Sequence, residues 1–172
     1  SDEVLSNLES LNEWSTARVQ PGKIVLGSLG GIETGVRQLI RARPLEVERV
    51  TIDGASLVVP TEAEILRIKA WLALRRNQTR DYLDIAAIAD HLGVDNAAEV
   101  LVGIDGYYAD DITKNSIAQQ VIRQLADPRP TDKSTVRELP SYKGLHPRWH
   151  DWRAVRSVLS EVSDGMIERL PS

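Results

Sequence analysis

The sequence predicts an α+β fold in which a small antiparallel sheet precedes a helical region. Up to Pro60, short β-type runs are separated by Gly, Pro and Asp-Gly, and after Pro60 the apolar residues recur at helical spacing. A hydrophobic content of 42% with 27% charged residues is typical of a globular chain. We therefore expect two domains, a sheet region over residues 1–60 and a helical region over residues 61–172.

Composition excludes several classes of protein. The chain has 172 residues and no Cys, which excludes disulfides, thiolate zinc sites and a cysteine nucleophile. No apolar run approaches the roughly 18–20 residues of a membrane span, so we expect no membrane partner and a cytoplasmic location. The net charge of −4 argues against non-specific coating of nucleic acid but allows a local basic cleft.

The first third contains one predicted helix and one predicted hairpin before residue 41. The helix spans residues 3–14, where apolar residues have helical spacing at Val4, Leu8 and Leu11. The hairpin spans "KIVLGSLGGIETGVRQLI", residues 23–40, and turns at Gly30-Gly31.

A second hairpin and a well-marked helix follow. "LEVERVTIDGASLVV", residues 45–59, has Asp53-Gly54 as a two-residue turn. Thr61 and Glu64 then have the spacing of a capping box, which predicts a helix that runs to about Arg76. We expect its apolar stripe to consist of Ile65, Ile68 and Leu72.

The rest of the chain is predicted to be helical apart from one loop. "NQT" indicates a turn, after which Thr79 begins a helix that ends at Leu92 before Gly93. Residues 95–110 and 113–127 carry two further helical patterns, and a polar loop spans about 127–147. The final helix carries Trp149, Trp152, Val155, Leu159 and Val162, and we expect the two Trp residues to pack rather than to stack on nucleic-acid bases.

Charged residues gather where the two central helices meet. Lys69, Arg76, Arg80 and Asp84 fall within an arc of roughly 80° on one continuous helix, and they face each other if the chain turns at residues 77–79. Lys and Arg bind phosphate, and a nearby carboxylate orders an Arg or holds Mg²⁺. The alternative is a solvated helix face with pairs of charges four residues apart.

The segment "KAWLALRRNQTRDYLDIAAIADHLG", preceded by "VPTEAEIL", resembles the AbiEii/AbiGii-type nucleotidyltransferases, which are toxins of bacterial abortive-infection and toxin–antitoxin systems. The family pattern is a Lys, an Arg seven residues later, and then Arg-Asp-x-x-Asp. Lys69, Arg76, Arg80, Asp81 and Asp84 match it in type and spacing.

This resemblance implies a polymerase-β-like nucleotidyltransferase core followed by a helical domain. The activity implied is transfer of a nucleotide from a Mg²⁺-bound nucleoside triphosphate to a protein or to an RNA such as a tRNA 3′ end, with a cognate antitoxin as a further partner. Lys69, Arg76 and Arg80 would contact phosphate, and Asp81 or Asp84 would be the catalytic carboxylate. The metal ligands stay unassigned.

The chain departs from that family at the metal-binding motif, a Gly-Ser turn followed by Asp-x-Asp on a strand. Gly27-Ser28 is followed only by Glu33, and Asp110-Asp111 lies in a helical context. We therefore expect a fragment or remnant that lacks this segment and is inactive alone; the only Met is Met166, which is also compatible with a removed initiator. The alternative function is a non-catalytic scaffold that binds a protein or RNA.

Overall fold

The computed structural model describes residues 2–38, 40–110 and 115–170. Within these ranges it confirms the α+β class, with two small antiparallel sheets and seven α-helices. The chain divides into two compact units, Ser1–Ile40 and Arg41–Ser172. The division at residue 60 separates strands from helices rather than compact units, and it stays a prediction.

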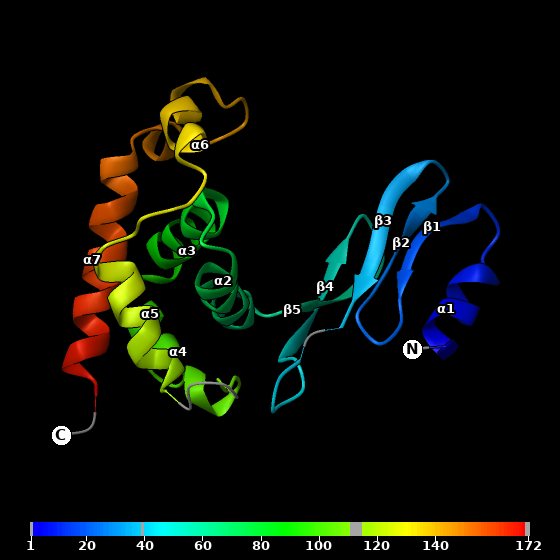
Figure 1. Cartoon of the computed structure of the whole chain (residues 1–172), viewed down its shortest axis with the longest axis horizontal. Coiled ribbons are helices and arrows are strands. Elements are labelled where there is room, and N and C mark those ends of the chain that lie inside the picture. Colours follow the sequence, from blue (N-terminus) through cyan, green and yellow to red (C-terminus); the bar gives the residue numbers. More distant parts are fainter. Residues whose placement is uncertain (1, 39, 111–114, 171–172) are drawn as a thin grey trace. The chain divides into compact units, whose positions relative to one another are not determined.

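The first unit is a three-stranded sheet with one helix. Its elements are α1 (Asp2–Glu9), β1 (Trp14–Gln20), β2 (Ile24–Leu29) and β3 (Ile32–Arg37), in the strand order β1-β2-β3 (Figure 1). The hairpin at Gly30-Gly31 is confirmed, because Leu29 pairs with Ile32 and both glycines have positive φ. The helix predicted over residues 3–14 is shorter, since Trp14 already begins a strand that we did not single out.

Gly27 lies inside strand β2 rather than in a turn. A Cβ atom at this position would lie 2.4 Å from the Ser15 carbonyl oxygen and 2.6 Å from the Trp14 ring. Glycine therefore lets the Trp14 ring lie across the strand. Gly27-Ser28 is thus part of the sheet, and it is not the Gly-Ser turn of the nucleotidyltransferases.

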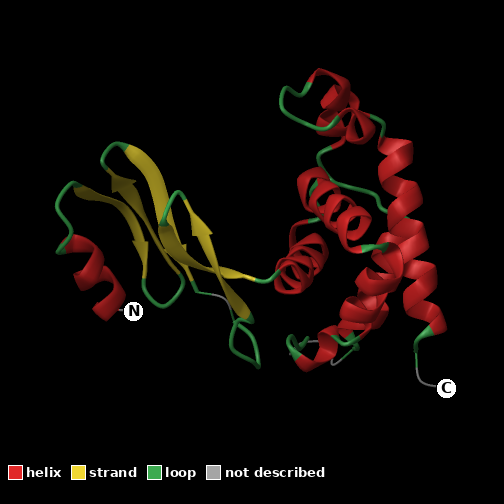
Figure 2. Ribbon diagram, turned by 180° about the vertical axis from the view of Figure 1, so that it is seen from behind, coloured by secondary structure: helices red, strands yellow, loops and turns green. Residues whose placement is uncertain are grey.

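The second unit is a two-stranded hairpin followed by helices. Its elements are β4 (Val47–Ile52), β5 (Ala55–Pro60), α2 (Glu62–Arg76), α3 (Thr79–Leu92), α4 (Val94–Val102), α5 (Ile117–Ala126), α6 (Lys133–Glu138) and α7 (Trp152–Glu168). The turn at Asp53-Gly54 is confirmed by the pairing of Ile52 with Ala55. Helix α7 packs against α3, α4 and α5, and α2 packs against α3, so the core of this unit lies among these five helices (Figure 2).

Helix α2 buries a different face from the one that we predicted. Ile65, Ile68 and Leu72 are only half-buried, whereas the fully buried apolar residues are Leu66, Ala70 and Ala73. Helices α3, α4 and α5 pack against α2, and apolar spacing alone does not reveal which of its residues they bury. The cap is confirmed, because the Thr61 hydroxyl accepts a hydrogen bond from the Glu64 N–H at 3.2 Å.

The last third differs from prediction mainly in its loops. The predicted loop over 127–147 contains α6 and a 3₁₀-helix, Leu139–Ser141, and a second 3₁₀-helix, Pro147–His150, begins at its end. Trp149 lies in that second turn and is buried, so α7 begins only at Trp152. Of the helix predicted over 113–127, residues 113 and 114 lie outside the described residues, as does Asp111.

Candidate functional site

The charged residues predicted from sequence lie on the α2–α3 hairpin. Helix α2 ends at Arg76, and Asn77 caps it in the left-handed conformation (φ 50°), with its N–H donating to the Ala73 carbonyl at 3.0 Å. Helix α3 begins two residues later at Thr79. The predicted turn is therefore confirmed. We call Lys69, Arg76, Arg80, Asp81 and Asp84 the hairpin cluster.

Two members of the hairpin cluster form an ion pair. Lys69 Nζ lies 2.6 Å from Asp84 Oδ2, and the two side chains are 29% and 44% exposed. Such a partly solvated pair contributes at most about 1 kcal/mol to stability. Arg76 and Arg80 form no ion pair with any residue that the structure describes.

Asp81 is the unusual member of the hairpin cluster. It is fully buried, and neither carboxylate oxygen has a hydrogen-bond partner among the described residues. Burial raises the pKa of the Asp81 carboxyl above its usual range, and the positive charges of Arg76, Lys69 and Arg80 act against that shift. An enclosed carboxyl of this kind does not present itself to a ligand in solution.

The roles assigned to the hairpin cluster remain untested predictions. The structure places Asp84 against Lys69 and encloses Asp81, so it distinguishes the two carboxylates without showing a function for either. Within residues 2–38, 40–110 and 115–170, no group of three or more His, Cys, Asp or Glu side chains is arranged to hold a metal ion. The Mg²⁺ ion expected with the resemblance stays an untested prediction, since Mg²⁺ is commonly held by one or two carboxylates and water.

Replacing Asp81 by Asn is expected to stabilise the protein by about 1 kcal/mol near neutral pH. The folded-state pKa of Asp81 is raised, so the folded state binds the proton more tightly than the unfolded state. The stability that this group contributes is complete below its unfolded pKa and is lost as the pH rises through the folded pKa. Urea unfolding near pH 7 and about pH 4 should show the gain only at the higher pH.

Asp84→Asn is the matched control for this substitution. It makes the same chemical change, but it breaks the ion pair with Lys69, so a loss of up to about 1 kcal/mol is expected near neutral pH. If Asp81→Asn instead destabilised the protein as Asp84→Asn does, Asp81 would be acting as a stabilising anion, and this account of it would be wrong.

A second cluster, which the sequence analysis missed, joins the segment before β4 to α2. Glu64 accepts hydrogen bonds from both terminal nitrogens of Arg41, one of them at 3.1 Å, and from the Glu46 N–H at 3.2 Å. Arg67 donates to Glu46 at 2.8 Å and lies 3.4 Å from Glu64. Tyr107 donates its hydroxyl proton to Glu46. We call these five residues the Arg–Glu–Tyr network.

The Arg–Glu–Tyr network is mostly enclosed. The side chains of Arg41, Glu64 and Arg67 are 5%, 0% and 10% exposed. The Arg67 guanidinium lies 4.0 Å from the centroid of the Tyr107 ring, a cation–π contact. Hydrogen bonds from Arg67 and then from Tyr107 hold the pKa of the Glu46 carboxyl below its usual range. The charged side chains of the network therefore pair with one another, which indicates a structural role.

Of these five residues, only Glu64 was singled out in the sequence, and only one of the two hydrogen bonds of the predicted capping box forms. We expected its carboxylate to complete a capping box with Thr61, but the Thr61 N–H donates to the Glu46 carbonyl at 3.0 Å. The Glu64 side chain turns instead toward Arg41 and Arg67.

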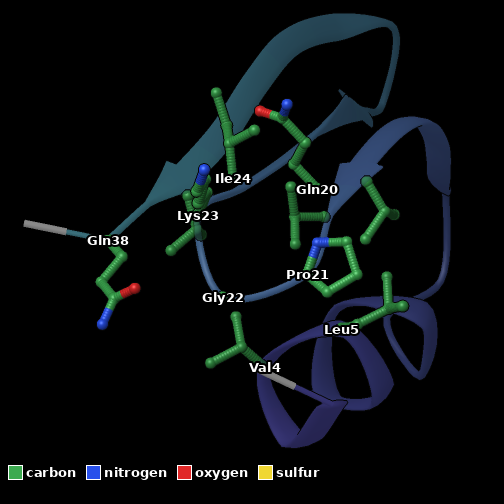
Figure 3. A pocket seen from close by; sticks show the side chains of 11 residues that line it. Val4, Leu5, Gln20, Pro21, Gly22, Lys23, Ile24 and Gln38 are labelled. Carbon is green, nitrogen blue, oxygen red and sulfur yellow. The ribbon is translucent and has the colours of Figure 1, made fainter.

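An aliphatic cleft lies in the first unit, between α1 and the sheet. The cavity has a volume of about 350 Å³. Val4 and Leu5 of α1 line it together with the turn at Pro21 and Gly22 (Figure 3). The sheet side is formed by aliphatic residues from all three strands, Val19, Ile24, Val25 and Val36. Ligand sites are commonly apolar cavities of roughly this size.

A smaller polar cavity of about 210 Å³ adjoins the cleft. The two share Gln20, Lys23 and Gln38, and the smaller one adds Arg37. Neither Lys23 nor Arg37 forms an ion pair with a residue in the described part of the chain. The two cavities together therefore combine an aliphatic lining with two cations, Lys23 in both cavities and Arg37 in the smaller one.

Comparison with known proteins finds transport proteins. The chain is 36% identical over 130 residues to the mycolic acid-containing lipids exporter MmpL11 of Mycolicibacterium smegmatis, a match that covers 74% of this chain and 13% of the exporter. It is 38% identical over 110 residues to the heme uptake protein MmpL11 of Mycobacterium tuberculosis, covering 60% of this chain and 11% of that protein. A probable transport protein MmpL11 of Mycobacterium leprae is 32% identical over 136 residues, covering 74% and 12%.

The match is to a small part of each relative. The chain spans about an eighth of the length of these curated proteins. No family model matches the chain. No solved structure matches it. None of the helices described is long and apolar enough to cross a bilayer.

These relatives correct the function predicted from the sequence. The resemblance to AbiEii-type nucleotidyltransferases is wrong, because the related proteins are named for transport and not for nucleotide transfer. The partners expected with it, a nucleoside triphosphate, an RNA such as tRNA, and an antitoxin, are withdrawn, as is the expectation that no membrane is involved. The polymerase-β-like core and the scaffold alternative gain no support either. In this chain the matched segment forms a helical hairpin, in which Lys69 of α2 pairs with Asp84 of α3.

Proposed function

We propose that this chain forms a part, outside the bilayer, of an MmpL11-like transport protein, and that it binds the acyl part of a lipid. The aliphatic cleft of the first unit is the observation that carries this proposal. Lys23 and Arg37 at the adjoining polar cavity suit the anionic head group of a fatty acid or related lipid. The relative named as an exporter of mycolic acid-containing lipids supports a lipid as the ligand.

The position relative to the membrane is part of the same proposal. The chain is similar to transport proteins, and no helix described here is long and apolar enough to cross a bilayer. The cytoplasmic face is the position that we propose, in keeping with a composition that lacks Cys.

The hydrophobic effect sets the expected dependence on chain length. Each methylene buried in an apolar site contributes about 0.8 kcal/mol, or a factor of about four in affinity. Saturated fatty acids should therefore bind more tightly as the acyl chain lengthens, by roughly fifteenfold for two methylenes, until the cleft is filled. Displacement of a fluorescent fatty acid from the full chain, by octanoate, decanoate and laurate in turn, measures this.

Two tryptophan substitutions on strand β3 test the location. Val36→Trp places a large side chain in the lining of the cleft and should weaken laurate binding at least tenfold. Ile32→Trp is the control, because Ile32 lies on the same strand, is 73% exposed and does not line the cleft. Equal effects of the two variants, or affinities independent of chain length, would contradict the proposal.

Substitution of the two cations tests whether they bind the head group of the ligand. Replacing Lys23 and Arg37 by Gln should weaken binding of laurate while leaving that of dodecanol, which has no charge, unchanged. Equal losses of affinity for laurate and dodecanol would show that the two cations do not bind the head group.

A further inference from the structure

Positive charge is concentrated in one stretch of the second unit. From Arg123 to Arg156 the sequence has eight Lys or Arg and four Asp or Glu, a net charge of +4, whereas the whole chain carries −4. The rest of the chain therefore carries −8. A basic region on an acidic chain marks a surface suited to an anionic partner.

Part of this stretch forms a cavity of about 540 Å³. Three cations and three apolar residues line it: Arg129, Lys133, Arg137, Pro130, Val136 and Trp152. We call it the basic pocket. Lys133 and Arg137 are four residues apart on α6, so they occupy one face of that helix, where like charges repel. A bound anion would relieve that repulsion.

The carboxylates nearby do not neutralise these two cations. Asp127 is paired with Arg129, with Nη2 and Oδ2 2.5 Å apart. Asp132 accepts hydrogen bonds from the Thr79 N–H at 2.8 Å and from the Thr79 hydroxyl at 2.9 Å. Neither Lys133 nor Arg137 forms an ion pair with a residue that the structure describes.

A third carboxylate near α6, that of Glu138, also lies outside the pocket lining. Glu138 follows Arg137 directly, and successive residues of a helix are about 100° apart around its axis. Glu138 does not line the pocket. The face of α6 that borders the pocket therefore carries positive charge only.

The apolar wall of the basic pocket indicates what kind of anion fits. Trp152 is half-buried and stands edge-on to the Tyr82 ring, with centroids 6.0 Å apart, so it is fixed in position beside the cations. A half-exposed tryptophan ring next to Lys and Arg is the combination found where proteins meet lipid head groups. A long nucleic acid would need a basic track beyond this stretch, and the rest of the chain is net negative.

We propose that the basic pocket binds the phosphate of anionic phospholipids at a bilayer surface, with Lys133 and Arg137 as the main contacts and Trp152 against the head-group region. The pocket belongs to the second unit, and the proposal does not depend on the aliphatic cleft of the first. A negative result for either site therefore leaves the other standing.

Vesicle sedimentation with the full chain tests this proposal. Binding is expected to vesicles of phosphatidylcholine mixed with phosphatidylglycerol, to be weaker in high salt, and to be absent with phosphatidylcholine alone. Replacing Lys133 and Arg137 together by Gln should weaken binding about thirtyfold, since each cation near an anionic surface contributes roughly fivefold. The control, Arg18→Gln with Arg49→Gln, removes the same charge from exposed strand positions and should change binding little.

The outcomes separate the candidate anions. Equal losses in the two double variants would show a general charge effect and overturn the site. Equal binding to neutral vesicles, or binding of inorganic phosphate, an acidic peptide or RNA without binding to anionic vesicles, would overturn the bilayer as the partner. Both side chains are exposed, so the Lys133→Gln, Arg137→Gln variant should fold normally. An unchanged circular dichroism spectrum would show that its loss of binding is not a loss of folding.

Discussion

Replacing Glu64 by Ala is expected to lower the free energy of unfolding by about 3–5 kcal/mol, the largest effect on stability that we predict for one side chain. Glu64 is fully buried and is shared by Arg41 and Arg67, whose side chains are 5% and 10% exposed. Its removal leaves two buried guanidinium groups without this carboxylate, and a buried charge that loses its partner is costly. Urea unfolding followed by the helical circular dichroism signal measures the loss.

The first turn of the same helix supplies the control. Glu62 is half-exposed and pairs with His91 at 3.3 Å, so Glu62→Ala should cost less than about 1 kcal/mol. Glu64→Gln keeps the shape of the side chain and removes its charge, so an intermediate loss is expected. A Glu64→Ala variant as stable as Glu62→Ala would contradict the view that the Arg–Glu–Tyr network holds the segment before β4 against α2.

Features governed by local chemistry could be predicted from the sequence. Gly30-Gly31 and Asp53-Gly54 adopt positive φ, which two-residue hairpin turns require, so both turns were found. The turn at Asn77 was found for the same reason, since Asn tolerates the left-handed conformation. What the sequence did not reveal is that the Asn77 side chain also donates to the Arg129 carbonyl, at 2.8 Å.

Features that depend on contacts between distant residues could not be predicted in this way. Leu66, Ala70 and Ala73 are buried on α2, against which α3, α4 and α5 pack, whereas apolar spacing alone favoured Ile65 and its neighbours. Glu64 meets Arg41 across 23 positions of sequence, a distance that no local pattern spans.

The hairpin cluster shows how a motif can mislead. Lys69 and Asp84 are brought together by the turn between α2 and α3, and they form an ion pair that any helical hairpin could use. A Lys, an Arg and two Asp residues at helical spacing therefore indicate a paired helix face as readily as a phosphate site. The cleft of the first unit had no such motif, since it is built from scattered aliphatic residues of α1 and three strands.

The second large effect is expected on export by a related transport protein, when its matched segment is deleted or is replaced by the aligned residues of this chain. An identity of 36% over 130 residues indicates that the matched segment of the M. smegmatis exporter has the fold described here, but a shared fold does not by itself establish a shared role. Our proposal predicts that the exporter fails when this segment is deleted. It also predicts that the aligned residues of this chain restore export.

Export of mycolic acid-containing lipids by cells that lack their own exporter is the most direct test. Three forms of the exporter would be compared at equal amounts in the membrane: the intact protein, the deletion, and the protein that carries the aligned 130 residues of this chain. Export lost in the deletion and regained in the exchange is the result that we predict. Export that stays absent in the exchanged protein, or that persists in the deletion, would contradict a role for this domain in transport.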